Sequence, residues 1–319
     1  MDSSSFKHQL AKIWNVDASD LPDELVKHAK NVHVDRIDED IAGSLAELDV
    51  QTEPAEQLPF VPKVRGKNYF EDDFRPAEQP WPVVMIHGTG ADRDYWHPMA
   101  ENLRADGWGV YALNFGNHGT RLIEDSATEV EAFISAVLRH TGADRAILIG
   151  HSQGGLLARY WMRHFDGARR TKHLVCLSSP NHGTTLGGIA SPLVTNKVAE
   201  KAMRSLIRYA LGPAAFQQIS GSELLQKTNA GGDVEEGVTY TCVATRFDAI
   251  VQPPESCFLR SSTPGQVRNV WVQDLEHGAQ VHHDEMPQDV RVIRLVRAVL
   301  DNLAEKEKNM DKNNDTSSA

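Results

Sequence analysis

The chain has few cysteines, and their number and spacing argue against a CxxC metal or redox site and against a disulfide framework. Its 319 residues include three cysteines, Cys176, Cys242 and Cys257, and no pair has the CxxC spacing of many zinc and redox sites. An odd number of scattered cysteines is not typical of a disulfide framework either. We therefore expect free thiols in a reducing compartment and no metal site.

Targeting signals, long apolar runs and basic runs are also lacking. The first residues, MDSSSFKHQLAKIW, do not have the basic start and continuous apolar core of a secretory signal. No apolar run approaches the roughly 20 residues that a membrane-spanning helix needs. The formal net charge is −11, and no basic run favours nucleic acid or anionic lipid. These features predict a cytoplasmic protein without nucleic-acid or integral membrane contacts.

Strand-like and helix-like segments alternate from Trp81 onward. We expect helices at 95–107, from a capping box at Ser126–Glu129, after Ser152, and at about 288–306. Alternating strands and helices predict an α/β fold with a mostly parallel, doubly wound sheet. The expected strands lie at 82–88, 109–116, 145–150, 173–180, 239–247 and 267–275.

The regions outside this alternation define the domain organisation. Residues 1–75 are interpreted as an N-terminal extension, 76–306 as the main domain, and the polar segment 307–319 as a disordered tail. An insertion at about 185–235 interrupts the alternation and contains a helical apolar stripe from Ala199 to Leu211. That stripe fits either a helix packed on the core or a cap over a bound acyl chain.

The pentapeptide Gly150-His151-Ser152-Gln153-Gly154 lies between a predicted strand and a predicted helix. This G-x-S-x-G pattern at a strand-to-helix turn is the nucleophile elbow. The tight turn strains the backbone of the serine and needs small neighbours, and it projects the hydroxyl above the sheet. Glycine and serine also fill ordinary turns, but the flanking strand and helix favour Ser152 as a nucleophile.

A serine nucleophile needs a base and a carboxylate that orients the base. In this arrangement the acid and then the histidine follow the serine in the chain, each after a later strand. Asp248 directly follows the strand at 239–247, so we predict that it is the acid rather than a turn cap. Three histidines, His277, His282 and His283, follow the last strand. Residue type alone does not choose the base among them.

The tetrahedral intermediate of acyl transfer needs two backbone N–H donors. One is expected at Gln153, directly after the nucleophile. The other is expected just beyond the first strand, within His87-Gly88-Thr89-Gly90, where glycines allow the backbone to approach a substrate oxygen. Thr89 is therefore the second predicted oxyanion donor. This chemistry requires no cofactor.

With these parts placed, the chain from about Asp73 to Leu303 resembles the α/β-hydrolase lipases and esterases of actinobacteria, the class 2 lipase group. The segments that carry the resemblance are GHSQGG, PNHGTT and TRFDAIVQP. The resemblance implies an α/β-hydrolase fold with a cap insertion, in which Ser152 is the nucleophile, Asp248 the acid and Thr89 an oxyanion donor.

The resemblance also selects one of the histidines. The histidine of the group precedes a pattern like H-x-x-x-P-x-D, which fits His283 and leaves His282 one residue out. His283 is therefore the predicted base, with His282 as the fallback. Secreted members carry cysteines where this chain reads DFRPAEQP, GPAAFQQ and QDLEHGA, and this difference again favours a cytoplasmic enzyme.

The predicted function is hydrolysis of carboxylic esters, small-molecule or lipid, through a Ser-Asp-His triad and an acyl-enzyme. A thioesterase or an acyltransferase would use the same acyl-enzyme with a different bond or acceptor. A binding protein that has lost catalysis is the less favoured alternative, because every triad position is filled.

Overall fold

The computed structural model describes residues 77–185 and 211–317, together with residues 7, 8, 34, 41, 45 and 48. Its centre is a six-stranded sheet in the order β2-β1-β3-β4-β5-β6, with every neighbouring pair parallel. The predicted parallel, doubly wound α/β sheet is thereby confirmed. The strands are β1 (Val83–Ile86), β2 (Val110–Leu113), β3 (Ala146–His151), β4 (Thr171–Leu177), β5 (Thr239–Ala244) and β6 (Val267–Trp271).

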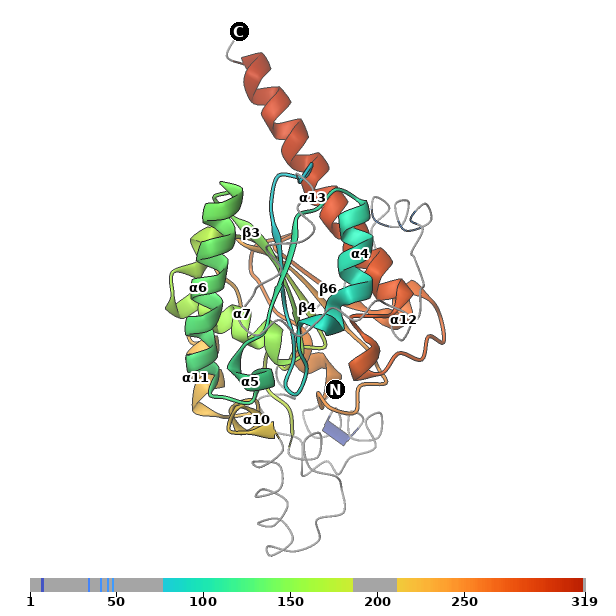
Figure 1. Cartoon of the computed structure of the whole chain (residues 1–319). Helices are drawn as coiled ribbons and strands as arrows, with labels where there is room; N and C mark the ends of the chain where they lie inside the picture. Colours follow the sequence, from blue (N-terminus) through green and yellow to red (C-terminus); the bar gives the residue numbers. More distant parts are fainter. Residues whose placement is uncertain are drawn as a thin grey trace, which may run out of the picture.

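Helices cover both faces of the sheet (Figure 1). On one face lie α6 (Ile123–Thr141) and α7 (Gln153–His164), and on the other lie α4 (His97–Ala105) and α13 (Val290–Ser317). The shorter elements are η3 (Arg93–Trp96), α5 (Gly116–Gly119), η4 (Gly167–Arg170), α10 (Ala214–Gln217), α11 (Glu223–Asn229), η5 (Pro254–Cys257), α12 (Val272–Leu275) and η6 (His283–Glu285). No helix of the described ranges is long and apolar enough to cross a bilayer.

Alternate side chains of each strand pack into two separate hydrophobic cores, one on each face of the sheet. In β1, Val84 and Ile86 join the cluster under α6 and α7, while Val83 and Met85 join the cluster under α4 and α13. Successive side chains of a strand point to opposite faces, and a parallel sheet is covered on both. This explains why β1, β2 and β3 read as largely apolar runs rather than as alternating patterns.

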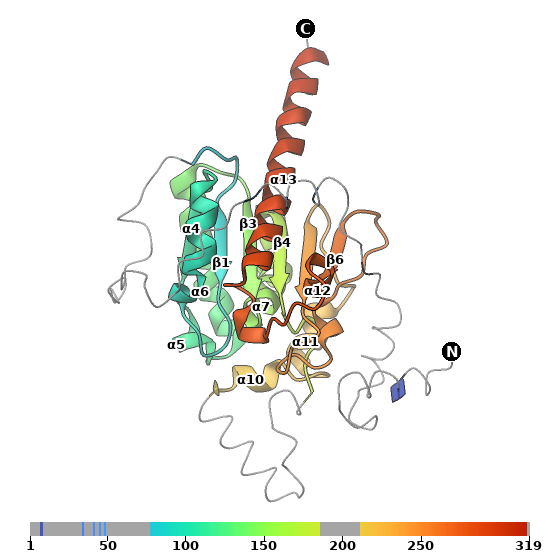
Figure 2. The same cartoon turned by 90° about the vertical axis from the view of Figure 1, so that its right-hand side faces the viewer.

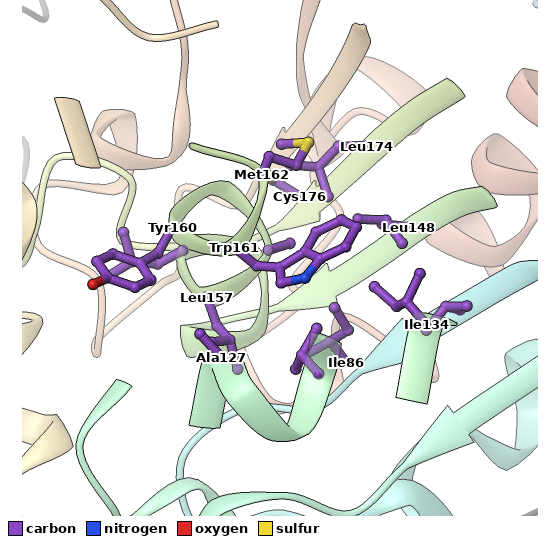
Figure 3. Close-up of a cluster of buried hydrophobic side chains, with 14 of the residues drawn as sticks. Ile86, Ala127, Ile134, Leu148, Leu157, Tyr160, Trp161, Met162, Leu174 and Cys176 are labelled. Atoms are coloured by element: carbon purple, nitrogen blue, oxygen red, sulfur yellow. The ribbon is translucent and has the colours of Figure 1, made fainter. Parts of the chain in front are cut away.

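Trp161 of α7 is the largest side chain in the cluster of Figure 3, and its indole makes a partly buried polar contact. Its indole N–H donates to Glu131 Oε2 over 2.8 Å, and Arg170 Nη2 donates to the same oxygen over 2.6 Å. The hydrogen bond from Arg170 lowers the pKa of Glu131 to about 2. The carboxylate thus joins α6 to the segment that precedes β4.

We expect Glu131→Gln to lower the free energy of unfolding by about 1–2 kcal/mol at pH 7, because the charge that binds Arg170 is lost while an acceptor for Trp161 remains. Urea denaturation followed by circular dichroism measures this change. Glu129→Gln is the matched control on the same helix, since Glu129 lies 3.9 Å from its partner Arg121. Equal losses in the two variants would contradict the prediction.

The start of α6 differs from the predicted capping box. The helix begins at Ile123, and Ser126 lies buried inside its first turn. The N–H of Ile123 donates to Gln217 Oε1 over 2.8 Å, from a side chain 94 residues away in the sequence. The predicted capping box is therefore wrong, because a distant side chain satisfies the helix start.

The end of the chain also differs from expectation. We expected the last helix to stop near residue 306 and the segment 307–319 to be disordered, but α13 continues through Ser317 (Figure 2). Glutamate and lysine at 305–308 have favourable helix propensities. In addition, the carboxylate of Glu307 accepts a hydrogen bond from Lys172 Nζ over 2.8 Å. This polar segment is therefore helical through Ser317 rather than a disordered tail.

Parts of the N-terminal extension and of the insertion lie within the described residues. Ile41 is 1% exposed, and Leu45 and Leu48 pack against the same cluster as α4 and α13. In the insertion, the N–H of Ala214 in α10 donates to the carbonyl of Thr120 after α5, and α11 packs against α7. The remainder of 1–75, and the apolar stripe of the insertion apart from Leu211, fall outside the described residues.

Candidate active site

The strand order reverses between β1 and β3. The chain passes from β1 to β2 on one side and then to β3 on the other, so the loops after β1 and β3 diverge. In open parallel sheets, ligands bind beyond the carboxyl ends of the strands at such a switch point. The loop after β1 holds the predicted oxyanion donor Thr89, and the turn after β3 holds Ser152.

The turn from β3 into α7 is strained at the serine. Ser152 has φ 51° and ψ −125°, a conformation that costs a non-glycine residue about 1–3 kcal/mol. A Cβ added at Gly154 would lie 2.0 Å from the carbonyl oxygen of Ile86, and one at Gly150 would lie 2.4 Å from the nitrogen of Gly155. Both positions therefore require glycine, because β1 and α7 pass so close to the turn.

The structure brings the side chains of Ser152, His283 and Asp248 into one hydrogen-bonded chain. His283 Nε2 lies 3.0 Å from Ser152 Oγ, and His283 Nδ1 lies 2.8 Å from Asp248 Oδ2. A carboxylate only accepts hydrogen bonds, so the proton of the neutral imidazole is on Nδ1 and Nε2 accepts from the serine hydroxyl. The three residues are buried and come from the loops after β3, β5 and α12.

The Asp248 carboxylate is held in its charged form. Burial alone would raise its pKa, but the adjacent His283 and two backbone donors leave the pKa below its ordinary value. The N–H groups of Ile250 and Val251 donate to Asp248 Oδ1 over 2.9 Å and 2.8 Å. A charged carboxylate in this position can orient an imidazole and stabilise the imidazolium.

The predicted oxyanion residues lie beside the nucleophile. Gln153 follows Ser152 at the start of α7, and a Cβ at Gly88 would lie 2.9 Å from the Cβ of Ser152. Within the described part of the chain, no acceptor binds the backbone N–H of Thr89 or of Gln153. Gln218 Nε2 donates to Thr89 Oγ1 over 3.0 Å, so the end of α10 fixes this loop.

The other two candidate histidines lie outside the hydrogen-bonded chain of Ser152, His283 and Asp248. His282 and His277 are exposed, and the ring of His282 packs edge-on against Phe247 with centroids 6.3 Å apart. The backbone N–H of His282 donates to Glu285 Oε2 over 2.7 Å, and this bond orients the turn that carries His283 inward. Among the residues described, no cluster of three side chains could hold a metal ion.

Comparisons with known proteins fit this geometry. A family described as "alpha/beta hydrolase fold" matches residues 82–228. Triacylglycerol lipases of Pseudarthrobacter phenanthrenivorans and Burkholderia plantarii are each 37% identical over 87 residues, which is 25% of this chain. These matches span about a quarter of the lipases themselves, 27% and 24% of their length.

A solved structure extends the likeness over more of the chain. The crystal structure of Aspergillus fumigatus lipase B superposes with a TM-score of 0.54 at 20% sequence identity, covering 66% of this chain and 50% of the lipase. At that identity the likeness concerns the fold. From its sheet and these matches, the chain has the α/β-hydrolase fold, with local sequence similarity to triacylglycerol lipases.

Proposed function

We propose that this protein is a serine hydrolase of carboxylic esters. The observation that carries the proposal is the hydrogen-bonded chain from Ser152 through His283 to Asp248. Its order and geometry fit a nucleophile, a general base and an orienting acid. The similarity of the chain to triacylglycerol lipases supports an ester as the substrate.

In the first half of the proposed reaction, Ser152 Oγ attacks the ester carbonyl carbon while His283 Nε2 takes the hydroxyl proton. Asp248 stabilises the resulting imidazolium. The backbone N–H groups of Thr89 and Gln153 donate to the negative oxygen of the tetrahedral intermediate. His283 then protonates the departing alcohol, and the acyl group remains on Ser152.

In the second half, a water molecule replaces the alcohol. His283 takes a proton from the water, and the hydroxide attacks the acyl-enzyme carbonyl. Collapse of the second tetrahedral intermediate returns the proton to Ser152 Oγ and releases the carboxylic acid. Every proton transfer uses His283, and the sequence of steps needs no cofactor.

Two exposed apolar side chains support a substrate with an apolar part. Phe247 and Ile250 flank Asp248 and are 40% and 46% exposed. They lie in the loop after β5, at the same end of the sheet as Ser152. We propose that they contact the apolar part of a small-molecule or lipid ester.

The test is the hydrolysis of p-nitrophenyl esters from acetate to palmitate by the wild-type protein and by Ser152→Ala. We expect kcat to fall about 10⁴–10⁶-fold in the variant, because nucleophile and base act as one unit. Ser135→Ala, which removes a hydroxyl from α6 away from the site, is the control and should keep full activity. Retention of activity by Ser152→Ala would rule out this function.

A second measurement separates hydrolysis from acyl transfer. Methanol added to the assay competes with water for the acyl-enzyme, and the yields of acid and methyl ester report the partition. An acyltransferase would form mainly methyl ester at low methanol concentration. Labelling by a fluorophosphonate, present in the wild type and lost in Ser152→Ala, reports the nucleophile independently of the ester chosen.

A further inference from the structure

The loop that carries His283 is long and has little backbone support of its own. It spans residues 276–289, between α12 and α13. Among the described residues its backbone–backbone hydrogen bonds are all local, such as Ala279 N–H to Glu276 O and Glu285 N–H to His282 O. A catalytic base must nevertheless be held within about 0.5 Å of its working position. Other groups must therefore fix the loop.

Three side-chain donors bind alternate carbonyls along this loop. Gln273 Nε2 donates to the carbonyl of Ala279 over 2.9 Å. Thr245 Oγ1 donates to the carbonyl of Val281 over 2.6 Å. The third carbonyl, that of His283 itself, lies 2.9 Å from a ring nitrogen of His151, Nε2.

The donors belong to the same segments as the rest of the site. His151 directly precedes Ser152, and Thr245 follows β5 three residues before Asp248. Gln273 of α12 also donates to Thr245 Oγ1 over 3.1 Å, which links two of the three donors. Its side-chain oxygen accepts from the backbone N–H of Arg246 over 3.1 Å, so the amide of Gln273 is fixed at both ends.

The protonation of His151 follows from its partner and its burial. A carbonyl oxygen only accepts, so His151 Nε2 carries the proton that binds the carbonyl of His283. Burial lowers the pKa of His151 to about 3, which keeps the ring neutral at working pH. The two rings lie with their centroids 4.9 Å apart. A neutral His151 therefore supports His283 without repelling the positive charge that forms on it.

We propose that Gln273, Thr245 and His151 are positioning residues for His283 and form a carbonyl clamp on the carbonyls of 279, 281 and 283. This inference rests on the proposed function, in which His283 is the base. The clamp holds the imidazole between Ser152 and Asp248. It thereby ties the orientation of the base to the two strands that supply the other catalytic groups.

The first test replaces Thr245 by valine, which has nearly the same shape and lacks the hydroxyl donor. We expect kcat for ester hydrolysis to fall about 10–100-fold while KM stays within about twofold, because the base is displaced and the binding surface is not. Thr245→Ser restores the donor and should recover kcat to within about threefold of the wild type.

A matched control separates positioning from general destabilisation. Thr228 of α11 is also buried, and its hydroxyl donates to the carbonyl of Leu224 over 2.8 Å. Thr228→Val therefore loses the same kind of bond away from the site, and we expect its kcat to equal that of the wild type. A similar loss of kcat in Thr228→Val and Thr245→Val would overturn the proposal, as would full kcat in Thr245→Val.

A substrate-independent readout keeps this inference separate from the proposed function. The proton between His283 Nδ1 and Asp248 gives a far-downfield ¹H NMR signal when the imidazole is held in place. We expect this signal in the wild type, in Thr245→Ser and in Thr228→Val, and its loss or broadening in Thr245→Val. If the wild type neither hydrolysed esters nor reacted with fluorophosphonate, the proposed function would fail, while an unchanged signal in Thr245→Val would overturn the clamp.

Discussion

Replacement of His283 by alanine is expected to lower kcat for ester hydrolysis about 10⁴-fold or more. The same change at the adjacent His282 is expected to alter kcat by less than about threefold. His283 Nε2 is 3.0 Å from the nucleophile, whereas the exposed His282 packs against Phe247. Measurement of kcat and KM for both variants on one p-nitrophenyl ester checks the prediction.

The pair His283→Ala and His282→Ala is a sharp comparison because the two positions are adjacent and the substitution is identical. Effects on expression or on the path of the loop should therefore be similar in both variants. Loss of activity in His282→Ala with retention in His283→Ala would transfer the role of base to His282. Retention of full activity in both variants would remove the base from this loop altogether.

Unfolding in mild acid is the second large expected effect, because three buried histidines are kept neutral by the fold. Burial lowers the pKa of His87 to about 4 and those of His151 and His173 to about 3. In the unfolded chain each has a pKa near 6.5. Below pH 6.5 the unfolded chain thus takes up protons that the folded protein does not, and folding stability falls with pH.

The size of this effect approaches the stability of a whole domain. Each histidine lowers the free energy of unfolding by about 1.4 kcal/mol per pH unit. Between pH 6.5 and 4 the three together lower it by on the order of 10 kcal/mol. Domains are typically stable by about 5–15 kcal/mol. We therefore expect the urea midpoint to fall steeply below pH 6.5 and the protein to unfold near pH 4.

His173 allows this prediction to be tested away from the active site. Its ring nitrogens bind the hydroxyls of Thr239 and Thr241 over 2.7 Å and 3.1 Å, at the amino ends of the strands. His173→Gln should be less stable at pH 7, yet its free energy of unfolding should fall less steeply between pH 6.5 and 4. The slope should correspond to about one proton fewer taken up on unfolding. His277→Gln, at an exposed position, controls for the substitution. An unchanged slope in His173→Gln would contradict the account.

Local sequence patterns were enough to predict the fold class and the positions of most strands. Runs rich in apolar residues and bounded by turns indicate β1 to β6, and each run is local in the chain, so its pattern can be read without the rest of the sequence. Ser152 and Asp248 were predictable for the same reason. Ser152 directly follows β3, Asp248 lies four residues past the end of β5, and the carboxyl ends of parallel strands meet at one edge of the sheet.

Local sequence patterns do not decide between His282 and His283. Adjacent side chains in a loop diverge, so the residue that faces Ser152 depends on the path of 276–289. In the structure, the side chains of Thr245, Gln273 and His151 form hydrogen bonds with carbonyls of this loop. These residues are distant in sequence or belong to other motifs. The resemblance to a family selected His283, but neither composition nor periodicity carries that information.

The sequence by itself determined the parallel α/β sheet, the elbow at Ser152 and the strand end at Asp248, because local patterns and backbone sterics specify these features. Tertiary structure alone decided where α6 begins and which histidine faces the serine. The start of α6 depends on a cap from Gln217, and the place of His283 depends on side chains of other segments. Contacts between residues far apart in the chain leave no periodic trace in the sequence, and for that reason only the folded protein reveals them.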